Sequence, residues 1–225
     1  MKVNFSSLQY VVSYYELHDK YPMLFNELPY HRQLNELLYY AARTGNEELC
    51  RSARKWGAND FNKMLKGAAV SGYEHLCHLA IKWNWGKINY NLLLLGAARG
   101  GHTNLCYLAR ERGATDLNKM LYKAARGGHE YLCQLAKEWG ANDFNEMIRG
   151  AAKSGDKHLC QLAKEWGADD FNEMLYGACE GAQIELCRLA KKWGATDFDK
   201  AFIIASLQKK NVHLIQFLNE IEQEN

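Results

Sequence analysis

The sequence is poor in proline and contains no long apolar segment. Its two prolines, Pro22 and Pro29, both precede residue 30, and nothing resembling a linker or low-complexity segment follows them. No run of 18 apolar residues occurs, which argues against a membrane-spanning helix. The first residues lack the apolar core and small-residue cleavage site of a secretory signal, so we expect no signal peptide.

The net charge is also small, and common catalytic motifs are absent. The formal net charge of the 225 residues is +2, so bulk charge indicates no particular partner. The chain has no G-x-S-x-G, no H-E-x-x-H and no phosphate-binding G-x-x-x-x-G-K. We therefore expect neither an enzyme nor a bound cofactor. With 48% hydrophobic residues, the chain can nevertheless bury a substantial core.

What the sequence does contain is an internal repeat. Six cysteines recur every 27 residues, with one interval of 29: Cys50, Cys77, Cys106, Cys133, Cys160 and Cys187. A second series has the same spacing, and we use it as the reference position of each repeat: Leu34, Phe61, Tyr90, Leu117, Phe144, Phe171 and Phe198. The two-residue insertion falls at 82–89. A constant period of this length is typical of a solenoid or array.

Each repeat is predicted to form two short helices. The first begins after an aspartate, which suits a helix N-cap: Asp60, Asp116, Asp143, Asp170 or Asp197. In "DFNE", at 143–146 and 170–173, a glutamate follows at the position expected of a capping box. A Gly-Gly or Ser-Gly pair then ends the helix, since glycine tolerates the left-handed conformation found there.

The repeat also predicts the domain organisation. Residues 1–33 do not follow the period, and we expect them to form an atypical helical cap, with a docking segment for another protein as the alternative. Six repeats follow, at 34–60, 61–89, 90–116, 117–143, 144–170 and 171–197. Residues 198–225 are predicted to be a C-terminal capping repeat that ends in polar residues.

The stretch "GAARGGHTNLCYLARERGATD", at 96–116, resembles the core of the ankyrin repeat. The Ala-Ala pair, the Gly-His turn, the following apolar residues and the closing Gly-Ala-x-Asp carry this resemblance. Ankyrin units are usually about 33 residues long, and the residues missing here correspond to the β-hairpin finger. The units are most similar to short ankyrin-like repeats encoded by large DNA viruses. The resemblance implies an all-α, ankyrin-like helix-turn-helix solenoid with short or absent fingers, in which His102 and His129 support their turns by hydrogen bonding.

The regularly spaced cysteines and tryptophans are predicted to be structural. Stacked helices lie about 10 Å apart, whereas a disulfide needs Cα atoms within about 7 Å, so we expect buried free thiols and a reducing, intracellular compartment. Cys179 replaces a core alanine and is expected to be buried too. Five tryptophans precede the closing glycine and are expected to pack between repeats: Trp56, Trp83, Trp139, Trp166 and Trp193. His75 and His78 lack a third ligand, so no metal site is expected.

The positions that the period does not explain lie five and nine residues after the reference position. They share one face of the first helix, and we call this row of side chains the stripe. Tyrosine and arginine, which are enriched at binding hot spots, recur along it. The predicted partner-binding residues are Tyr39, Arg43, Lys66, Arg99, Tyr122, Arg126, Arg149, Lys153 and Tyr176.

The composition of the stripe predicts a protein partner with an acidic patch. A solvated helix surface is the simplest alternative. Single-stranded nucleic acid could also stack on such a stripe, although Glu146, Glu173 and Glu180 interrupt it. A self-assembling structural protein is a third possibility.

Overall fold

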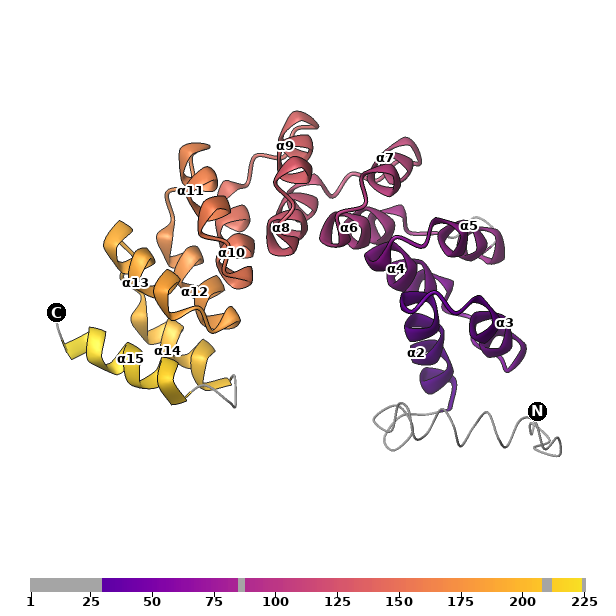
Figure 1. Ribbon diagram of the computed structural model, residues 1–225, viewed down its shortest axis with the longest axis horizontal. Coiled ribbons are helices and arrows are strands. Elements are labelled where there is room, and N and C mark those ends of the chain that lie inside the picture. The colour runs from indigo at the N-terminus through magenta and orange to yellow at the C-terminus, as the bar shows by residue number, and fades with distance from the viewer. Residues whose placement is uncertain (1–29, 85–87, 208–211, 224–225) are drawn as a thin grey trace. The chain divides into compact units, whose positions relative to one another are not determined.

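The computed structural model describes residues 30–84, 88–207 and 212–223, and all regular structure within these ranges is helical (Figure 1). The first helices of successive repeats are α2 (Tyr30–Arg43), α4 (Phe61–Ser71), α6 (Tyr90–Gly100), α8 (Leu117–Gly127), α10 (Phe144–Ser154), α12 (Phe171–Gly181) and α14 (Phe198–Leu207). The second helices are α3 (Glu47–Lys55), α5 (Glu74–Trp83), α7 (Thr103–Glu111), α9 (Glu130–Glu138), α11 (Lys157–Glu165), α13 (Ile184–Trp193) and α15 (Val212–Gln223). The predicted all-α class is thus confirmed, while most of the predicted cap at 1–33 lies outside the described residues.

The chain divides into two compact units. The first holds residues 1–68 and 73–88, and the second holds residues 69–72 and 89–225. Within the second unit, the first helices α6, α8, α10, α12 and α14 contact one another in series, each with its neighbour along the chain. Each of these helices also contacts the second helix of its own repeat. The first helices of this unit therefore form one layer and the second helices another (Figure 1).

The helices begin and end where the sequence pattern predicts. Asp143 caps α10, and its side chain accepts a hydrogen bond from the Glu146 N–H at 3.0 Å. Asp170 differs, because its carboxylate accepts from the Asn172 N–H instead. Gly155 ends α10 with φ of 85°, and Ala182 takes the same left-handed conformation after α12, with φ of 58°.

The core of each repeat is built from alanine, cysteine and larger aliphatic side chains. On α10, Met147, Ile148 and the Ala pair that follows are fully buried. Gly150 allows α8 and α10 to approach closely, because a Cβ atom there would lie 2.5 Å from the carbonyl oxygen of Tyr122. All seven cysteines are buried and free, as predicted. Burial raises the pKa of Cys106 to about 12, which keeps its thiol protonated at neutral pH.

A ladder of asparagines connects successive repeats. Each of these asparagines directly follows the reference position of its repeat. Its side-chain oxygen accepts hydrogen bonds from two backbone N–H groups in the turn that ends the same repeat. The acceptors are Asn35, Asn91, Asn118, Asn145 and Asn172, and their partners lie 24 and 25 residues further along the chain. Those turns lead directly into the next first helix. The ladder therefore fixes the start of each repeat onto the one before it.

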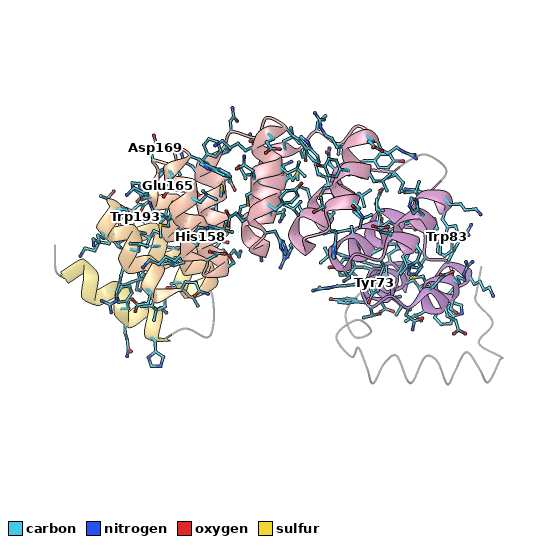
Figure 2. All side chains as sticks on the ribbon, turned by 45° about the horizontal axis from the view of Figure 1, so that its top comes forward. Tyr73, Trp83, His158, Glu165, Asp169 and Trp193 are labelled. Atoms are coloured by element: carbon cyan, nitrogen blue, oxygen red, sulfur yellow. The ribbon has the colours of Figure 1, made fainter. Side chains whose placement is uncertain are left out.

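Four of the five tryptophans pack against the preceding repeat, as predicted: Trp83, Trp139, Trp166 and Trp193. Trp193 meets the ring of Phe171 edge-on at 5.6 Å, and Lys164 of the preceding repeat lies over the Trp193 ring at 4.3 Å (Figure 2). Lys137 lies in the same way over Trp166, at 4.3 Å. A cation from one repeat thus covers an aromatic pair of the next, a favourable arrangement for a partly buried indole.

The two turn histidines also make the hydrogen bonds that the resemblance implies. His102 Nε2 lies 3.2 Å from the carbonyl oxygen of Val70, and His129 Nε2 lies 3.1 Å from that of Arg99. Each imidazole therefore ties its turn to the end of the preceding first helix.

Candidate functional site

The stripe of the first unit combines an aromatic and a basic side chain on one helix. On α2, Arg43 Nη1 lies 3.5 Å from the hydroxyl oxygen of Tyr39, and the Tyr39 ring meets Tyr40 edge-on at 5.2 Å. Lys66 is exposed on α4. Lys63, a neighbour on α4, is paired with Glu36.

On α8 of the second unit, the stripe presents Tyr122 and Arg126. These residues lie one helical turn apart, and both are partly exposed. Lys123 places its ammonium group 5.0 Å from the centre of the Tyr122 ring. Arg126 pairs with no carboxylate among the described residues. Together with the exposed Arg99 on α6, these side chains give this end of the unit a positive, partly aromatic surface.

On α10 and α12, the unit neutralises its own cations. Arg149 Nη1 lies 3.1 Å from Glu173 Oε2, and its other terminal nitrogen donates to Glu180. Lys153 also donates to Glu180. Burial would raise the pKa of Glu180, but the hydrogen bonds from Arg149 and Lys153 bring it below its usual value. Arg149 and Lys153 are therefore engaged within the protein, unlike Arg126.

Tyr176 does not reach the surface in the way the sequence analysis expects. Its side chain is buried on α12 with 5% of its area exposed, and its hydroxyl donates to Asp197 at the end of the same repeat. Lys200 covers the ring at 4.0 Å. Burial and the bond to Asp197 raise the pKa of Tyr176. We therefore leave Tyr176 out of the binding surface proposed below.

The stripe continues onto α14, which the sequence analysis did not recognise. Phe202, Ile203 and Leu207 are exposed to 37%, 60% and 76%, respectively. Ile203 and Leu207 stand five and nine residues after Phe198, in the register of Tyr122 and Arg126. The predicted polar residues lie after α14, at the end of the chain, and α14 itself presents apolar side chains. The signal is in the spacing, because Phe198 continues the series of reference positions.

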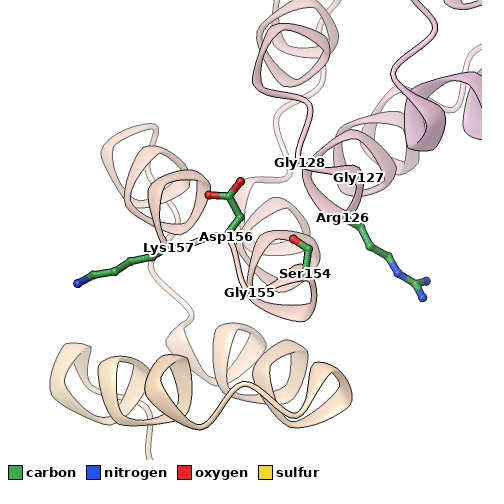
Figure 3. Close-up of a pocket in the computed structure, with 7 residues that line it drawn as sticks. All are labelled: Arg126, Gly127, Gly128, Ser154, Gly155, Asp156 and Lys157. Carbon is green, nitrogen blue, oxygen red and sulfur yellow. The ribbon is translucent and has the colours of Figure 1, made fainter.

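A pocket of about 480 Å³ opens at the C-terminal end of α8 (Figure 3). It is lined by Arg126, Gly127, Gly128, Ser154, Gly155, Asp156 and Lys157. Asp156 stands where the two preceding repeats carry His102 and His129. The Asp156 side chain is shorter than that of histidine and points toward Gly128. Its carboxylate would lie 3.9 Å from a Cβ atom placed on Gly128. The turn is therefore left open, and the opening lies beside Arg126.

The second helices carry a mostly polar outer surface. His158 Nε2 lies 3.0 Å from Glu130 Oε2, and both side chains are well exposed (Figure 2). The exceptions are two tyrosines that the sequence analysis did not single out: Tyr107 is exposed to 42% and Tyr131 to 62%. The ring of Tyr107 meets Trp139 edge-on at 5.3 Å. These tyrosines offer natural control positions away from the stripe.

Other kinds of site find little support in the part of the chain that the structure describes. No group of three histidine, cysteine, aspartate or glutamate side chains there could hold a metal ion. His75 Nε2 lies 3.8 Å from a Glu47 carboxylate oxygen on the exposed surface. None of the described helices has the length and apolar character to span a bilayer.

Comparison with known proteins adds no family assignment. No protein-family model matches the chain, and no curated protein matches it significantly.

Proposed function

We propose that this chain is a non-enzymatic, ankyrin-like repeat protein that binds another protein through the stripe of its second unit. The observation that carries the proposal is the contrast along that stripe. Arg149 and Lys153 are neutralised by Glu173 and Glu180, whereas Arg126 has no such carboxylate among the described residues. An arginine beside a partly exposed tyrosine is the kind of anchor that dominates protein interfaces.

The chemistry of this anchor favours a partner with an acidic patch. A carboxylate can form two parallel hydrogen bonds with the guanidinium of Arg126, which gives direction as well as attraction. Tyr122 offers a large contact area at a low cost in side-chain entropy. The buried free cysteines support an intracellular, reducing setting for the encounter.

Single-stranded nucleic acid is the alternative ligand of the same stripe. A bound strand needs a continuous row of unpaired cations along its phosphates. The pairing of Arg149 and Lys153 with Glu180 interrupts that row in the middle of the second unit. We therefore favour a protein partner, and nuclease treatment tests the choice.

The test is an affinity capture from candidate host-cell lysate, read by mass spectrometry with and without nuclease. It compares the wild-type chain with the double variant Tyr122→Ala/Arg126→Ala. A matched control, Tyr131→Ala/Arg112→Ala, removes the same two residue types from exposed positions on α9 and just after α7. Circular dichroism should show that all three proteins remain equally helical, because every substituted side chain is at least partly exposed.

We expect a protein that is captured by the wild type and the control, lost with the stripe variant, and indifferent to nuclease. Equal capture by all three proteins would exclude the stripe as the binding surface. If the control variant loses the captured protein and the stripe variant keeps it, the binding surface lies on the side of the second helices. Recovery that disappears with nuclease would make nucleic acid the ligand.

A further inference from the structure

The apolar residues on α14 give the stripe of the second unit a second, chemically different end. Since α8, α10, α12 and α14 contact one another in sequence, the stripe runs continuously from Arg126 to Leu207. On α8 it offers Arg126, which pairs with no carboxylate among the described residues, and it then passes over the ion pairs of α10 and α12. It ends at Ile203 and Leu207, with the exposed Phe202 beside them. A ligand lying along it meets charge at one end and apolar surface at the other.

We propose that this stripe binds an extended peptide segment with an acidic side chain at one end and an apolar side chain at the other. The proposal rests on the protein-binding function argued above and adds the chemistry of the partner. The acidic side chain pairs with Arg126, and the apolar side chain packs against Ile203 and Leu207.

The packing of helices sets the separation between the two anchors. Neighbouring packed helices lie about 8–10 Å apart, so the three steps from α8 to α14 span roughly 30 Å. An extended chain advances about 3.3 Å per residue. The acidic and apolar side chains of the segment are therefore separated by about nine residues.

Between the two anchors, the stripe on α10 and α12 offers little to attract a ligand. Glu180 accepts from both Arg149 and Lys153, so neither sign of charge is left to attract a ligand there. Tyr176 is buried beneath Lys200. The segment therefore crosses α10 and α12 without a strong charge requirement, and its specificity comes from its two ends.

The size of the apolar patch argues for a peptide anchor over a second copy of this chain. An aromatic side chain offers roughly 150–250 Å², and if Ile203 and Leu207 are taken near the lower end of that range, the exposed fractions of the three side chains amount to roughly 300 Å². A stable dimer buries about 800 Å² on each partner. One or two inserted side chains suffice to cover a patch of this size.

The experiment selects ligands from a displayed library of random 16-residue peptides against the immobilised full chain. Enriched peptides are synthesised, and their Kd values are measured by fluorescence polarisation. The variants are Arg126→Glu for the charged end and Ile203→Asp/Leu207→Asp for the apolar end. Arg112→Glu and Tyr131→Asp make the matched changes just after α7 and on α9, where both residues are exposed.

We expect enriched peptides to share an acidic and an apolar residue about nine positions apart. Each stripe variant should weaken binding at least tenfold, whereas each control should change it less than twofold. Exchanging the acidic residue of the peptide for lysine should restore binding to Arg126→Glu, which a general loss of folding could not produce.

Three results would overturn the inference. If Arg126→Glu weakens the binding of the peptides and the α14 variant does not, the proposed function stands but α14 is not an apolar anchor. A library without enrichment would exclude peptide recognition, and the capture experiment would then judge the proposed function separately. Concentration-dependent light scattering that is abolished by Ile203→Asp/Leu207→Asp would show that a second copy covers α14.

Discussion

Removing one asparagine of the ladder should loosen the joint between two repeats. The Asn145 side-chain oxygen accepts the N–H groups of Asp169 and Asp170 at 3.0 and 3.1 Å. Its Nδ2 also donates to the Asp169 carboxylate at 3.1 Å. Asn145→Ala removes all of these contacts at the turn that leads into α12.

The magnitude follows from the number of bonds and their exposure. A hydrogen bond contributes about 0.5–1.5 kcal/mol net, and the turn is exposed, so water can replace part of the loss. We expect the free energy of unfolding to fall by about 1–2 kcal/mol for the two backbone bonds. For a chain of this size, each kcal/mol lowers Tm by about 2–4 °C.

The last repeat provides a matched control. Asp199 occupies the same register as Asn145, but no described repeat follows it. Asp199→Ala should therefore change the free energy of unfolding by less than about 0.5 kcal/mol. Urea unfolding followed by circular dichroism measures both variants. Hydrogen exchange of the Asp169 and Asp170 amides reports the broken contacts directly. Unchanged exchange of these amides in Asn145→Ala would refute the ladder as a source of coupling between repeats.

Three further predictions concern the pH dependence, the ion pairs and a strained turn. Burial raises the pKa of Cys50, Cys77, Cys106, Cys133 and Cys160 to about 12. Their stabilising contribution is therefore complete below about pH 9 and is lost as the pH rises toward 12, at up to about 1.4 kcal/mol per pH unit for each thiol. Thermal unfolding should therefore show a much lower Tm at pH 10.5 than at pH 7. An equal Tm at both pH values would contradict the burial of the thiols. Glu180→Gln removes the carboxylate that neutralises Lys153 and one of the two that neutralise Arg149, so an acidic peptide should bind more tightly in fluorescence polarisation. Unchanged binding would mean that Lys153 does not face the ligand. Ala182→Gly relieves a positive φ and should raise the free energy of unfolding by about 1 kcal/mol, unlike the same change at the helical core residue Ala178, which should lower it.

The period predicts most of the fold because each repeat uses the same local signals. Aspartates such as Asp143 mark where the first helices begin, and glycines such as Gly155 mark where they end. The asparagine ladder was not predicted, although its residues recur at the same spacing. Within "DFN", an asparagine suits a helix start, and nothing local reveals that its side chain bonds to a turn 24 residues away.

The stripe was predictable as a face but not in its detail. Whether a side chain is exposed there depends on residues at the end of its own repeat and in the following repeat. Tyr176 is buried because Asp197 and Lys200 bond to it and cover it, and Arg149 is neutralised because Glu173 and Glu180 lie on the next helix. These pairings join residues more than 20 positions apart, which a helix-by-helix analysis does not compare.

The most direct test of the central claim is a hydroxyl-radical footprint of the full chain with a selected peptide or captured partner bound. It measures how strongly each exposed side chain is oxidised with and without the ligand. The account predicts that binding protects Tyr122, Ile203 and Leu207 and leaves Tyr107 and Tyr131 on the second helices unchanged. Protection of Tyr107 and Tyr131 without protection of Tyr122 would place the ligand on the second helices and contradict the account.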